Sequence, residues 1–518
     1  MRENEYDIVI LGGALSGTAM AILLKRERPH LRVAIVEKSI EFDRKVGEST
    51  SEVAGCFLTK VLNLSGYLYR TQIAKHGLRM WFTSPENESM GRCSEIGGDF
   101  QPKLPGFQLD RAQVDAHLLD LAVEAGCELI RPATIRSFEL GGIGKNAVEI
   151  KAEGGEMRTL RADWVVDASG KAALIGRKRG TIRRLEDHPT NAIWARFRGT
   201  KDFDGHELRS KFAECYGKGL HAPRGTATNH LMGYGWWCWI IPLQNGDVSA
   251  GLTWDTRLFT PPEGKNLTER LHQHLLSHPV GREIFGEAMV VEKDTRTYSH
   301  LPYYNEEVMG EGWAVVGDAG GFMDPLYSQG IDYIGYTVYS VHKIILDALG
   351  GADVEERITG YNAAYQASYH TWYAALYKNK YQYLGDAELM HAAFVLDLAA
   401  YFIGPVRLAY EFTDQEFQRL PYVHGVGPLV GKFMSFYNRR LAAIARKRRA
   451  SGKYGAENVG RRFIISEGFN PSLRTFRLLA KGIGLWLRAE VRSAFLRSPG
   501  LPHVEERPSK TRDLLADA

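Results

Sequence analysis

The sequence predicts an α/β fold in which a Rossmann-like dinucleotide-binding domain carries an inserted β-sheet and is followed by a helical region. Three observations predict it: a Gly-rich turn after the first apolar run, alternating apolar and polar runs in the middle of the chain, and helical patterns from about residue 352 onward. We expect a first module over residues 1–350, with its inserted sheet mainly within 186–295, and a helical region over 351–518.

The amino-acid composition indicates the broad class of protein. The chain has 518 residues, of which 44% are hydrophobic and 24% charged, as in an ordinary globular enzyme of two or three domains. A net charge of +4 gives no reason to expect a nucleic-acid partner. The cysteines show no metal-ligand spacing, and their odd number, five, fits a reducing compartment. No signal peptide and no apolar run of the roughly 18 residues of a membrane span is evident, so we expect a cytoplasmic protein without a metal site.

The N-terminal segment has the pattern of a dinucleotide-binding βαβ unit. Residues 6–11 form a short apolar strand, a Gly-rich turn follows at once, and a second strand over 31–36 ends at Glu37. Glu37 comes 20 residues after the last glycine of the turn, where a carboxylate can hold ribose hydroxyls. The turn residues expected at the pyrophosphate are Gly12, Gly13, Ala14 and Gly17. Ala14 departs from the usual glycine but is small, and the alternative is a nucleotide-free α/β fold.

Two later segments favour FAD as the dinucleotide. Residues 162–170 (ADWVVDASG) form a strand that ends in Asp167 and Gly170, and residues 313–330 (WAVVGDAGGFMDPLYSQG) form a strand, a Gly-Asp turn and a helix start. Asp318 can accept a hydrogen bond from a ribityl hydroxyl, and helix-start N–H groups favour an anion or a polar ring edge. No second Gly-rich unit for a nicotinamide is present. An ordinary strand–loop–helix connection is the alternative.

With these segments the chain resembles the FAD-dependent monooxygenases that have a hydroxybenzoate-hydroxylase-like fold. The resemblance implies FAD contacts at Gly12, Gly17, Glu37, Asp167, Gly170 and Asp318. Arg111, in QLDRAQVD, matches the arginine that this family places beside the FAD pyrophosphate. A solvated helix arginine is the alternative.

Further segments resemble the flavin-dependent halogenases, a branch of the same fold. VGEST at 46–50 is similar to their GES segment, which implies that Gly47, Glu48 and Ser49 line the flavin. Lys75, in KHG, matches the setting of their catalytic lysine, and its alternative is an ordinary loop lysine. Residues 237–242 (WCWIIP) match their WxWxIP hallmark. In that family the two indoles, here Trp237 and Trp239, keep substrate away from the flavin. The structural alternative is a packed strand of a sheet, and both can hold, because the same residues can form core and exclude substrate.

The segment 322–330 matches the pattern F-x-x-P-x-x-S-x-G of the same branch through Phe322, Pro325, Ser328 and Gly330. There a halide lies near backbone N–H groups, which here implies Ser328, Gln329 and Gly330. Tyr327 stands where the tryptophan halogenases have a glutamate, so the resemblance points to the branch that acts on phenols and related electron-rich rings.

The resemblance covers residues 6–350 and implies a two-component reaction. A separate flavin reductase supplies FADH2, O2 forms a peroxyflavin, chloride or bromide takes its distal oxygen, and Lys75 directs the hypohalous acid to an aromatic carbon. The substrate is then an aromatic small molecule, free or bound to a carrier protein. Two rivals remain: an FAD-dependent aromatic hydroxylase, and a flavin reductase of a lipid-like substrate.

The remaining stretches leave alternatives open. Residues 82–107 are polar and contain Gly and Pro, so we expect a long loop. The aromatic stretch 361–383 is either helix packing or a wall of the substrate site. Residues 472–497 form a basic amphipathic pattern that suits a membrane surface, an acidic partner or plain solvation.

Overall fold

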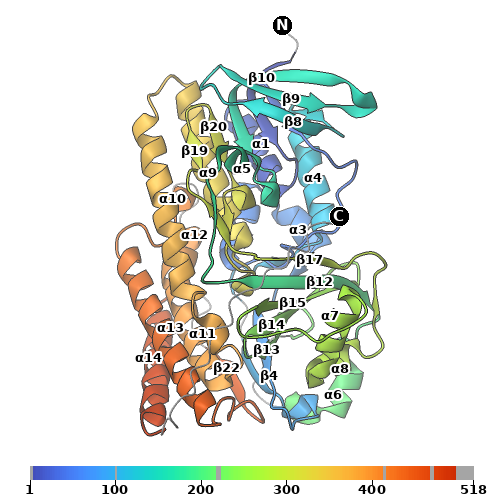
Figure 1. Ribbon diagram of the computed structural model, residues 1–518, viewed down its shortest axis with the longest axis vertical. Coiled ribbons are helices and arrows are strands. Elements are labelled where there is room, and N and C mark those ends of the chain that lie inside the picture. Colours follow the sequence, from blue (N-terminus) through green and yellow to red (C-terminus); the bar gives the residue numbers. More distant parts are fainter. Residues whose placement is uncertain (1–3, 100–101, 217–222, 412–415, 467–471, 497–518) are drawn as a thin grey trace.

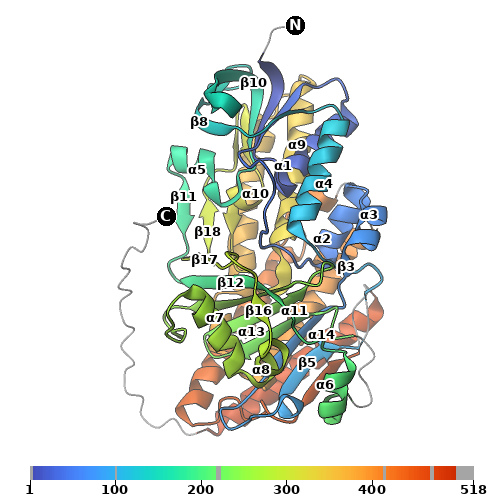
Figure 2. The same ribbon diagram turned by 90° about the vertical axis from the view of Figure 1, so that its right-hand side faces the viewer.

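Two large β-sheets lie one above the other, and a layer of long helices runs along their side (Figure 1). The computed structural model describes residues 4–99, 102–216, 223–411, 416–466 and 472–496. Figure 2 shows the first sheet above the second, with α13 and α14 at the lower end.

The first sheet is the predicted dinucleotide-binding unit. Its strands lie in the order β19 (Met309–Gly310), β20 (Trp313–Val315), β10 (Met157–Asp167), β1 (Glu5–Leu11), β2 (Val33–Val36) and β7 (Glu128–Ile130). Strand β9 (Asn146–Lys151) also pairs with β10, and β8 (Thr134–Glu139) pairs with β9. The strands from β20 to β7 are parallel, and Leu11, Asp167 and Val315 stand level with one another. Because parallel strands end at one edge, the turns that follow these three residues meet there. The expected strands at 6–11 and 31–36 are thus present with slightly different ends.

Three helices position this edge: α1 (Leu15–Glu27), α4 (Arg111–Glu124) and α9 (Gly330–Leu349). Helix α1 packs against both of the others. Its almost continuously apolar sequence is explained by burial on nearly all sides, from the sheet and from these two helices.

The second sheet contains the expected inserted strands. It runs β16 (Met289–Val290), β12 (Thr190–Arg198), β15 (Val248–Asp255), β14 (Trp236–Pro242), β13 (Thr228–Gly233), β4 (Leu78–Phe82), β5 (Ser94–Gly98) and β22 (Arg462–Ile465), with β17 (Arg296–Tyr298) also paired to β12. Strand β14 alternates as a period of two requires. Trp237, Trp239 and Ile241 face the main core, whereas Cys238 and Ile240 face α7 (Leu267–Ser277) and α8 (Pro279–Phe285).

Within its described residues the C-terminal region is helical, as expected, apart from one strand, and the end of the predicted region, 497–518, lies outside the described residues. Its long helices are α10 (Glu355–Leu376), α11 (Ala387–Tyr401), α13 (Gly427–Ala450) and α14 (Leu473–Ala494), with the short α12 (Arg407–Glu411) between them. Strand β22 leaves this layer and pairs in parallel with β5, so the second sheet reaches well outside residues 186–295. The prediction of a long loop over 82–107 was wrong in part, because β5 forms there against β4 and β22.

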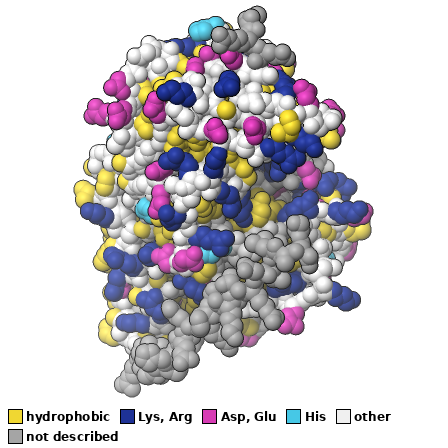
Figure 3. Space-filling view, turned by 45° about the horizontal axis from the view of Figure 1, so that its top comes forward, with side chains coloured by type: hydrophobic (Ala, Val, Ile, Leu, Met, Phe, Trp, Pro, Cys, Tyr) yellow, Lys and Arg dark blue, Asp and Glu magenta, His cyan; other side chains and the backbone are white. Residues whose placement is uncertain are grey.

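Short elements join these layers: α2 (Glu52–Cys56), α3 (Ser65–Thr71), α5 (Leu174–Arg179), α6 (His206–Lys211), β3 (Ile73–Ala74), β6 (Phe107–Gln108), β11 (Ile182–Arg184), β18 (Tyr303–Asn305) and β21 (Gly321–Phe322). One described stretch, Ala387–Glu411, is long and apolar enough to cross a membrane, but 67% of its most apolar window is buried in the fold, which is the burial of a core helix. On the face shown in Figure 3, basic and acidic side chains are interspersed.

Candidate active site

Three turns meet at the carboxyl edge of the first sheet. Gly12 has φ +110°, and a Cβ built on it would lie 2.6 Å from the carbonyl oxygen of Ala168. A Cβ on Gly317 would lie 2.5 Å from Oγ of Ser16. Only glycine fits at these two positions, because a side chain would displace the neighbouring turn. The three sequence segments predicted to hold FAD are therefore in contact with one another.

The Gly-rich turn is joined to Glu37 by a hydrogen bond and leads directly into the start of α1. The backbone N–H of Gly13 donates to Oε2 of Glu37 at 2.8 Å, and Ser39 N–H donates to Oε1 at 2.8 Å. Burial favours a higher pKa for Glu37, but these backbone bonds outweigh it and lower the pKa, so the side chain is an anion at neutral pH. Helix α1 begins after Ala14 with no side chain capping its first N–H groups. These open donors fit the pyrophosphate of a dinucleotide.

Arg111 joins the start of α4 to the 46–50 segment. Its guanidinium forms two 3.1 Å bonds with Asp115 and donates from Nη1 to the carbonyl of Val46 at 3.2 Å. A Cβ on Gly47 would lie 2.8 Å from that Nη1. Burial raises the pKa of Asp318 to about 6, against the opposing charge of Arg111. Arg111 is thus held in place beside the edge where Asp318 lies.

The local environment of Asp167 differs from those of Glu37 and Asp318. Its buried carboxylate accepts the N–H of Ser169 at 3.0 Å and the N–H of Ile175 at 2.7 Å. Both oxygens are engaged by backbone, so Asp167 fixes the turn that carries Gly170. Gly170 has φ +62°, and the position of its missing side chain is open space. The turn can therefore receive a ligand at Gly170.

Lys75 lies at the centre of the site, between three of the predicted segments. It follows β3 and is buried, and Gly77, with φ +74°, turns the chain behind it. Its Nζ donates to the carbonyl of Thr50 at 2.8 Å and to Oγ of Ser328 at 3.4 Å. Ser328 Oγ in turn donates to Oγ of Ser49 at 3.1 Å. The KHG, GEST and SQG segments are therefore linked through one lysine.

Burial lowers the pKa of Lys75 to about 8, and electrostatic attraction to Glu52 and Asp332 limits the fall. Burial also raises the pKa of Glu52, and it raises the pKa of Asp332 to about 8, so Asp332 gains its full charge only above neutral pH. Burial, with a smaller contribution from the Lys75 ammonium, lowers the pKa of His230 to about 3, so that His230 is neutral. An ammonium has three N–H donors, and two of those of Lys75 are used. The third is left for a species in the adjoining cavity.

Glu48 points away from this centre. Its carboxylate accepts Nη2 of Arg196 at 2.6 Å and Nε of the same residue at 3.1 Å, and both side chains are almost fully buried. Arg196 belongs to β12, so this pair ties the 46–50 segment to the second sheet. Ser49 adds a second tie through its 2.8 Å hydrogen bond with Thr228 of β13.

The loop before α9 has an unusual backbone. Tyr327 and Ser328 have φ +71° and +61°, left-handed values that cost energy in residues with a side chain. Gln329 follows, and its Oε1 accepts Trp372 Nε1 and the hydroxyl of Tyr377. Because the Gln329 side chain is engaged in this way, it leaves the first N–H groups of α9 uncapped. The space beside Gly330 is open, so an anion can approach these donors.

A narrow cavity of about 70 Å³ begins beside Lys75 and reaches the helical layer. It is lined mainly by apolar and aromatic residues: Ser51, Glu52, Lys75, His76, Gly77, Leu78, Gly98, Tyr327, Gln329, Trp372, Leu376, Phe394, Asp397, Leu398, Tyr401, Phe402, Pro405, Tyr422 and Met434. Tyr327 and Phe394 stack at a centroid distance of 5.9 Å. The C-terminal helices therefore supply much of the cavity wall.

Asp397 is a cavity residue that sequence reasoning missed. Its Oδ2 accepts Nζ of Lys380 at 2.6 Å and the hydroxyl of Tyr327 at 2.9 Å, while Oδ1 accepts the hydroxyl of Tyr437. These side chains are buried, so a fixed charge pair lies beside the cavity. Glu52 was missed too. The aromatic stretch 361–383 was the available signal, and it contributes Trp372 and Leu376 to the wall.

The tryptophans of β14 lie in the core behind the site. Trp237 Nε1 donates to the hydroxyl of Tyr381 at 2.9 Å, and that hydroxyl donates to Oδ2 of Asp324 at 2.8 Å. Trp239 Nε1 donates to Ser249 at 3.3 Å. Asp324 lies between Phe322 and Pro325 on the loop. Trp237 therefore holds the 322–330 segment in place through Tyr381 and Asp324. The burial and the contacts of Trp237 are those expected of a residue in a packed strand.

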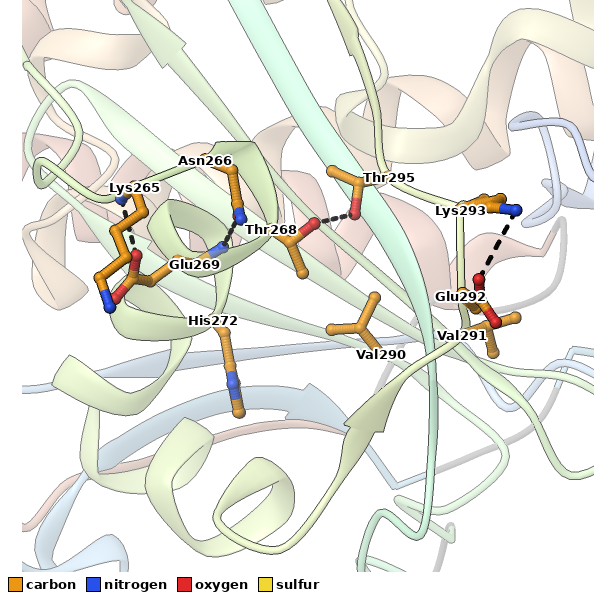
Figure 4. A pocket seen from close by; sticks show the side chains of 10 residues that line it. All are labelled: Lys265, Asn266, Thr268, Glu269, His272, Val290, Val291, Glu292, Lys293 and Thr295. Carbon is orange, nitrogen blue, oxygen red and sulfur yellow. Dashed lines mark hydrogen bonds and ion pairs between the residues drawn. The ribbon is translucent and has the colours of Figure 1, made fainter.

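A larger groove of about 730 Å³ lies at the surface beside α7 (Figure 4). It contains none of the predicted site residues. Its polar side chains bond to each other, as Thr268 does with Thr295 at 2.6 Å, or to nearby backbone, as Asn266 does with Glu269. The described residues contain no group of three or more His, Cys, Asp or Glu side chains placed to hold a metal ion.

Comparison with known proteins gives one consistent family. Residues 90–382 match the family model "Tryptophan halogenase". The chain is 24% identical to flavin-dependent halogenase chlA of Dictyostelium discoideum over 79% of this chain and 73% of that protein. It is also 24% identical to the 1H-pyrrole-2-carbonyl-[peptidyl-carrier protein] chlorinase of Pseudomonas fluorescens over 72% and 83%.

Solved halogenase structures share the fold of this chain. The structure of the halogenase PltM superposes with a TM-score of 0.74 at 16% identity, covering 94% of this chain and 99% of that one. PltM has also been solved with phloroglucinol and FAD, and that structure superposes with a TM-score of 0.72. At this level of identity the likeness establishes the fold.

Proposed function

This chain belongs to the tryptophan halogenase family of flavin-dependent enzymes, which use FAD and a halide, and from this premise we propose that it installs chlorine or bromine on an electron-rich, phenol-like ring through Lys75. The observation that carries the proposal is the position of Lys75. It is a buried ammonium with one free N–H, held between Thr50 and Ser328 at the end of an aromatic-lined cavity.

The residues at the first sheet fit FAD, and each has a part in holding it. Gly12 to Gly17 and the start of α1 would hold the pyrophosphate, Glu37 the ribose, and Asp318 and Arg111 the region near the flavin. Bound as FADH2, the cofactor supplies with O2 the oxidising power that turns a halide into an electrophile. The uncapped N–H groups of α9 at Gly330 would hold the halide.

Lys75 then controls where the electrophile reacts. Its third N–H donates to hypohalous acid and holds it against a ring in the cavity. As the O–halogen bond breaks and the carbon–halogen bond forms, the ammonium stabilises the departing hydroxide, which takes up the proton lost from the same ring carbon and leaves as water. Positioning of this kind favours one carbon of the ring over the others. Ser328 and the carbonyl of Thr50 keep the Lys75 side chain in one place while this happens.

A phenol-like substrate is supported by the polar groups of the cavity. Tyr327 supplies a hydroxyl in place of the carboxylate of the tryptophan-specific enzymes, and this hydroxyl is already donated to Asp397. Glu52 and Asp397 provide acceptors for a ring hydroxyl, while Trp372 and Phe394 provide apolar faces for the ring. The cavity of about 70 Å³ is smaller than the roughly 150 Å³ that holds benzene, so binding of a ring requires the wall to open. We propose that the ring enters free or attached to a carrier protein, as in the pyrrole relative, and that a separate reductase supplies FADH2.

The proposal is tested by a product assay. The protein is supplied with FAD, a flavin reductase and a nicotinamide donor, and matched phenols, indoles and pyrroles are compared with bromide, chloride or no halide. We expect a mass increase with the halogen isotope pattern on phenols, dependent on halide. A gain of one oxygen without halide would instead identify a hydroxylase, and reduction of an alkene without O2 consumption would identify a lipid-type reductase.

The pH dependence of the reaction should follow Lys75. The neutral amine has only two N–H groups, and the bonds to Thr50 and Ser328 use both, so kcat/KM should fall by up to tenfold per pH unit as pH rises above about 8. Asp332, whose pKa burial raises to about 8, titrates in the same range, and its carboxylate favours the ammonium form of Lys75. Lys171 has a pKa lowered to about 8 by burial as well, but it lies outside the cavity, so Lys171→Gln should leave the position of this limb unchanged. A profile that stays flat to pH 10, or a limb that moves with Lys171→Gln, would contradict the role of Lys75.

A further inference from the structure

Helix α14 carries its large apolar side chains on the outside. Leu473, Phe476, Leu487, Val491 and the adjoining Phe495 are between 50% and 84% exposed. Together with the exposed Ala480 and Gly484 they follow one another at spacings of three and four residues, which places them in one stripe along the helix. The stripe extends over roughly 33 Å, at 1.5 Å per residue.

The opposite face of α14 is small and attaches the helix to the protein. Thr475, Gly482, Ala489 and Ser493 are buried there, with Leu478 as the one large apolar residue among the buried positions. A Cβ on Gly482 would lie 2.7 Å from Leu396 of α11, so this glycine lets the two helices approach closely. Figure 1 shows α14 at the outer edge of the helical layer. A helix whose outer face is only solvated would expose polar side chains on that face instead of large apolar ones.

A basic stripe runs beside the apolar one. Arg474, Arg477, Lys481, Arg488 and Arg492 each directly follow a member of the apolar stripe. Within the part of the chain that the structure describes, Arg474, Arg477 and Arg488 have no carboxylate partner, and Arg492 pairs with Glu388 at 2.8 Å. The acid of this helix, Glu490, is turned toward α13, where it pairs with Arg440 at 2.7 Å.

The neighbouring helix extends the surface. Phe436 of α13 is 45% exposed and meets Trp486 of α14 edge to face at a centroid distance of 5.8 Å. Trp486 donates from Nε1 to Glu490 at 3.1 Å, so its polar edge is satisfied and its ring lies at the boundary of the apolar stripe. An indole at such a boundary is typical of helices that lie in a water–lipid interface.

We infer that α14 is a membrane-surface helix, which docks the protein on a bilayer containing anionic lipids. The apolar stripe enters the headgroup region, and the arginines beside it meet the lipid phosphates. A second copy of the chain is a poor occupant, because a two-fold contact through the same stripe would bring the two arginine rows together. This inference is independent of the proposed reaction, although α11 and α13, on which α14 packs, also line the cavity.

The test measures partitioning of the full-length, FAD-loaded protein onto vesicles by flotation. We expect binding to vesicles of phosphatidylcholine with about one third phosphatidylglycerol, and far weaker binding to pure phosphatidylcholine. Replacing Arg474, Arg477 and Arg488 by Gln should weaken binding about 100-fold. Leu487→Gln with Val491→Gln should weaken it by at least about tenfold. All five side chains are exposed, so these variants should fold normally and keep their activity on a water-soluble substrate.

Matched controls come from exposed apolar side chains elsewhere. Met157 and Met289 are 58% and 73% exposed and lie in the two sheets, so Met157→Gln with Met289→Gln should leave partitioning unchanged. The inference is overturned if the wild-type protein does not bind anionic vesicles, or if the α14 variants bind them as strongly as the methionine controls do. Capture of an acidic carrier protein by wild type, without any vesicle binding, would overturn it in favour of a protein partner.

Discussion

Lys75→Met should reduce halogenation of the ring by about 100-fold to 1000-fold or more while FAD remains bound. Methionine has a similar length and no charge, so the two hydrogen bonds to Thr50 and Ser328 are lost and the third N–H disappears with them. The fold should survive, because burial already disfavours the ammonium form of this lysine. The measurement is the rate of halogenated product under saturating halide, with flavin absorbance as the check on cofactor binding.

The same variant separates delivery of the electrophile from its formation. If Lys75 acts only on hypohalous acid, then a small reporter that reacts with free hypohalous acid should still be halogenated by Lys75→Met. Lys60→Met is the matched control, since Lys60 also donates two hydrogen bonds, to the backbone carbonyls of Ala409 and Tyr410, but lies outside the cavity. Retention of ring halogenation within about fivefold in Lys75→Met would remove the lysine from the mechanism.

Glu95→Gln should destabilise the protein by about 3–5 kcal/mol, the largest stability effect we expect from a single conservative change. Glu95 is fully buried on β5 and accepts two bonds from Arg224, at 2.9 and 2.6 Å. Arg79 lies 3.6 Å away and Arg462 3.8 Å away. Burial favours a higher pKa for Glu95, but the three guanidinium groups outweigh it and lower the pKa. An amide would leave these cations without their buried counter-charge.

The measurement is the free energy of unfolding in denaturant for the FAD-free protein. Because the folded-state pKa of Glu95 lies below its unfolded value, its contribution is present at neutral pH and is lost as pH falls below about 4. Glu307→Gln is the matched control, because Glu307 also pairs with an arginine, Arg179, at 2.6 Å, but both side chains are partly exposed. It should cost less than about 1 kcal/mol. Equal losses in the two variants would mean that burial of the Glu95 cluster is unimportant.

The local pattern was sufficient to predict the first sheet and the motifs. The strand at 6–11, the turn, the strand before Glu37 and the helix start near Gln329 are encoded by neighbouring residues, and the structure has each within a few positions. The family resemblance assigned Lys75, Ser328 and Ser49 to the site one by one, and only the structure shows that their side chains contact one another. Asp397 and Glu52 could not be found in this way, because neither stands in a recognisable pattern and each becomes informative only by facing the cavity.

By itself the sequence determined the dinucleotide-binding unit, the order of the motifs and the class of enzyme, since these depend on short-range spacing and on letters shared with a family. Only the tertiary structure decided that β22 joins β5, that the cavity wall comes from α10, α11 and α13, and that the apolar stripe of α14 faces outward. The physical reason is that these features arise from contacts between residues hundreds of positions apart. A helical pattern shows which residues share a face, but the packing of the whole chain decides which face is buried.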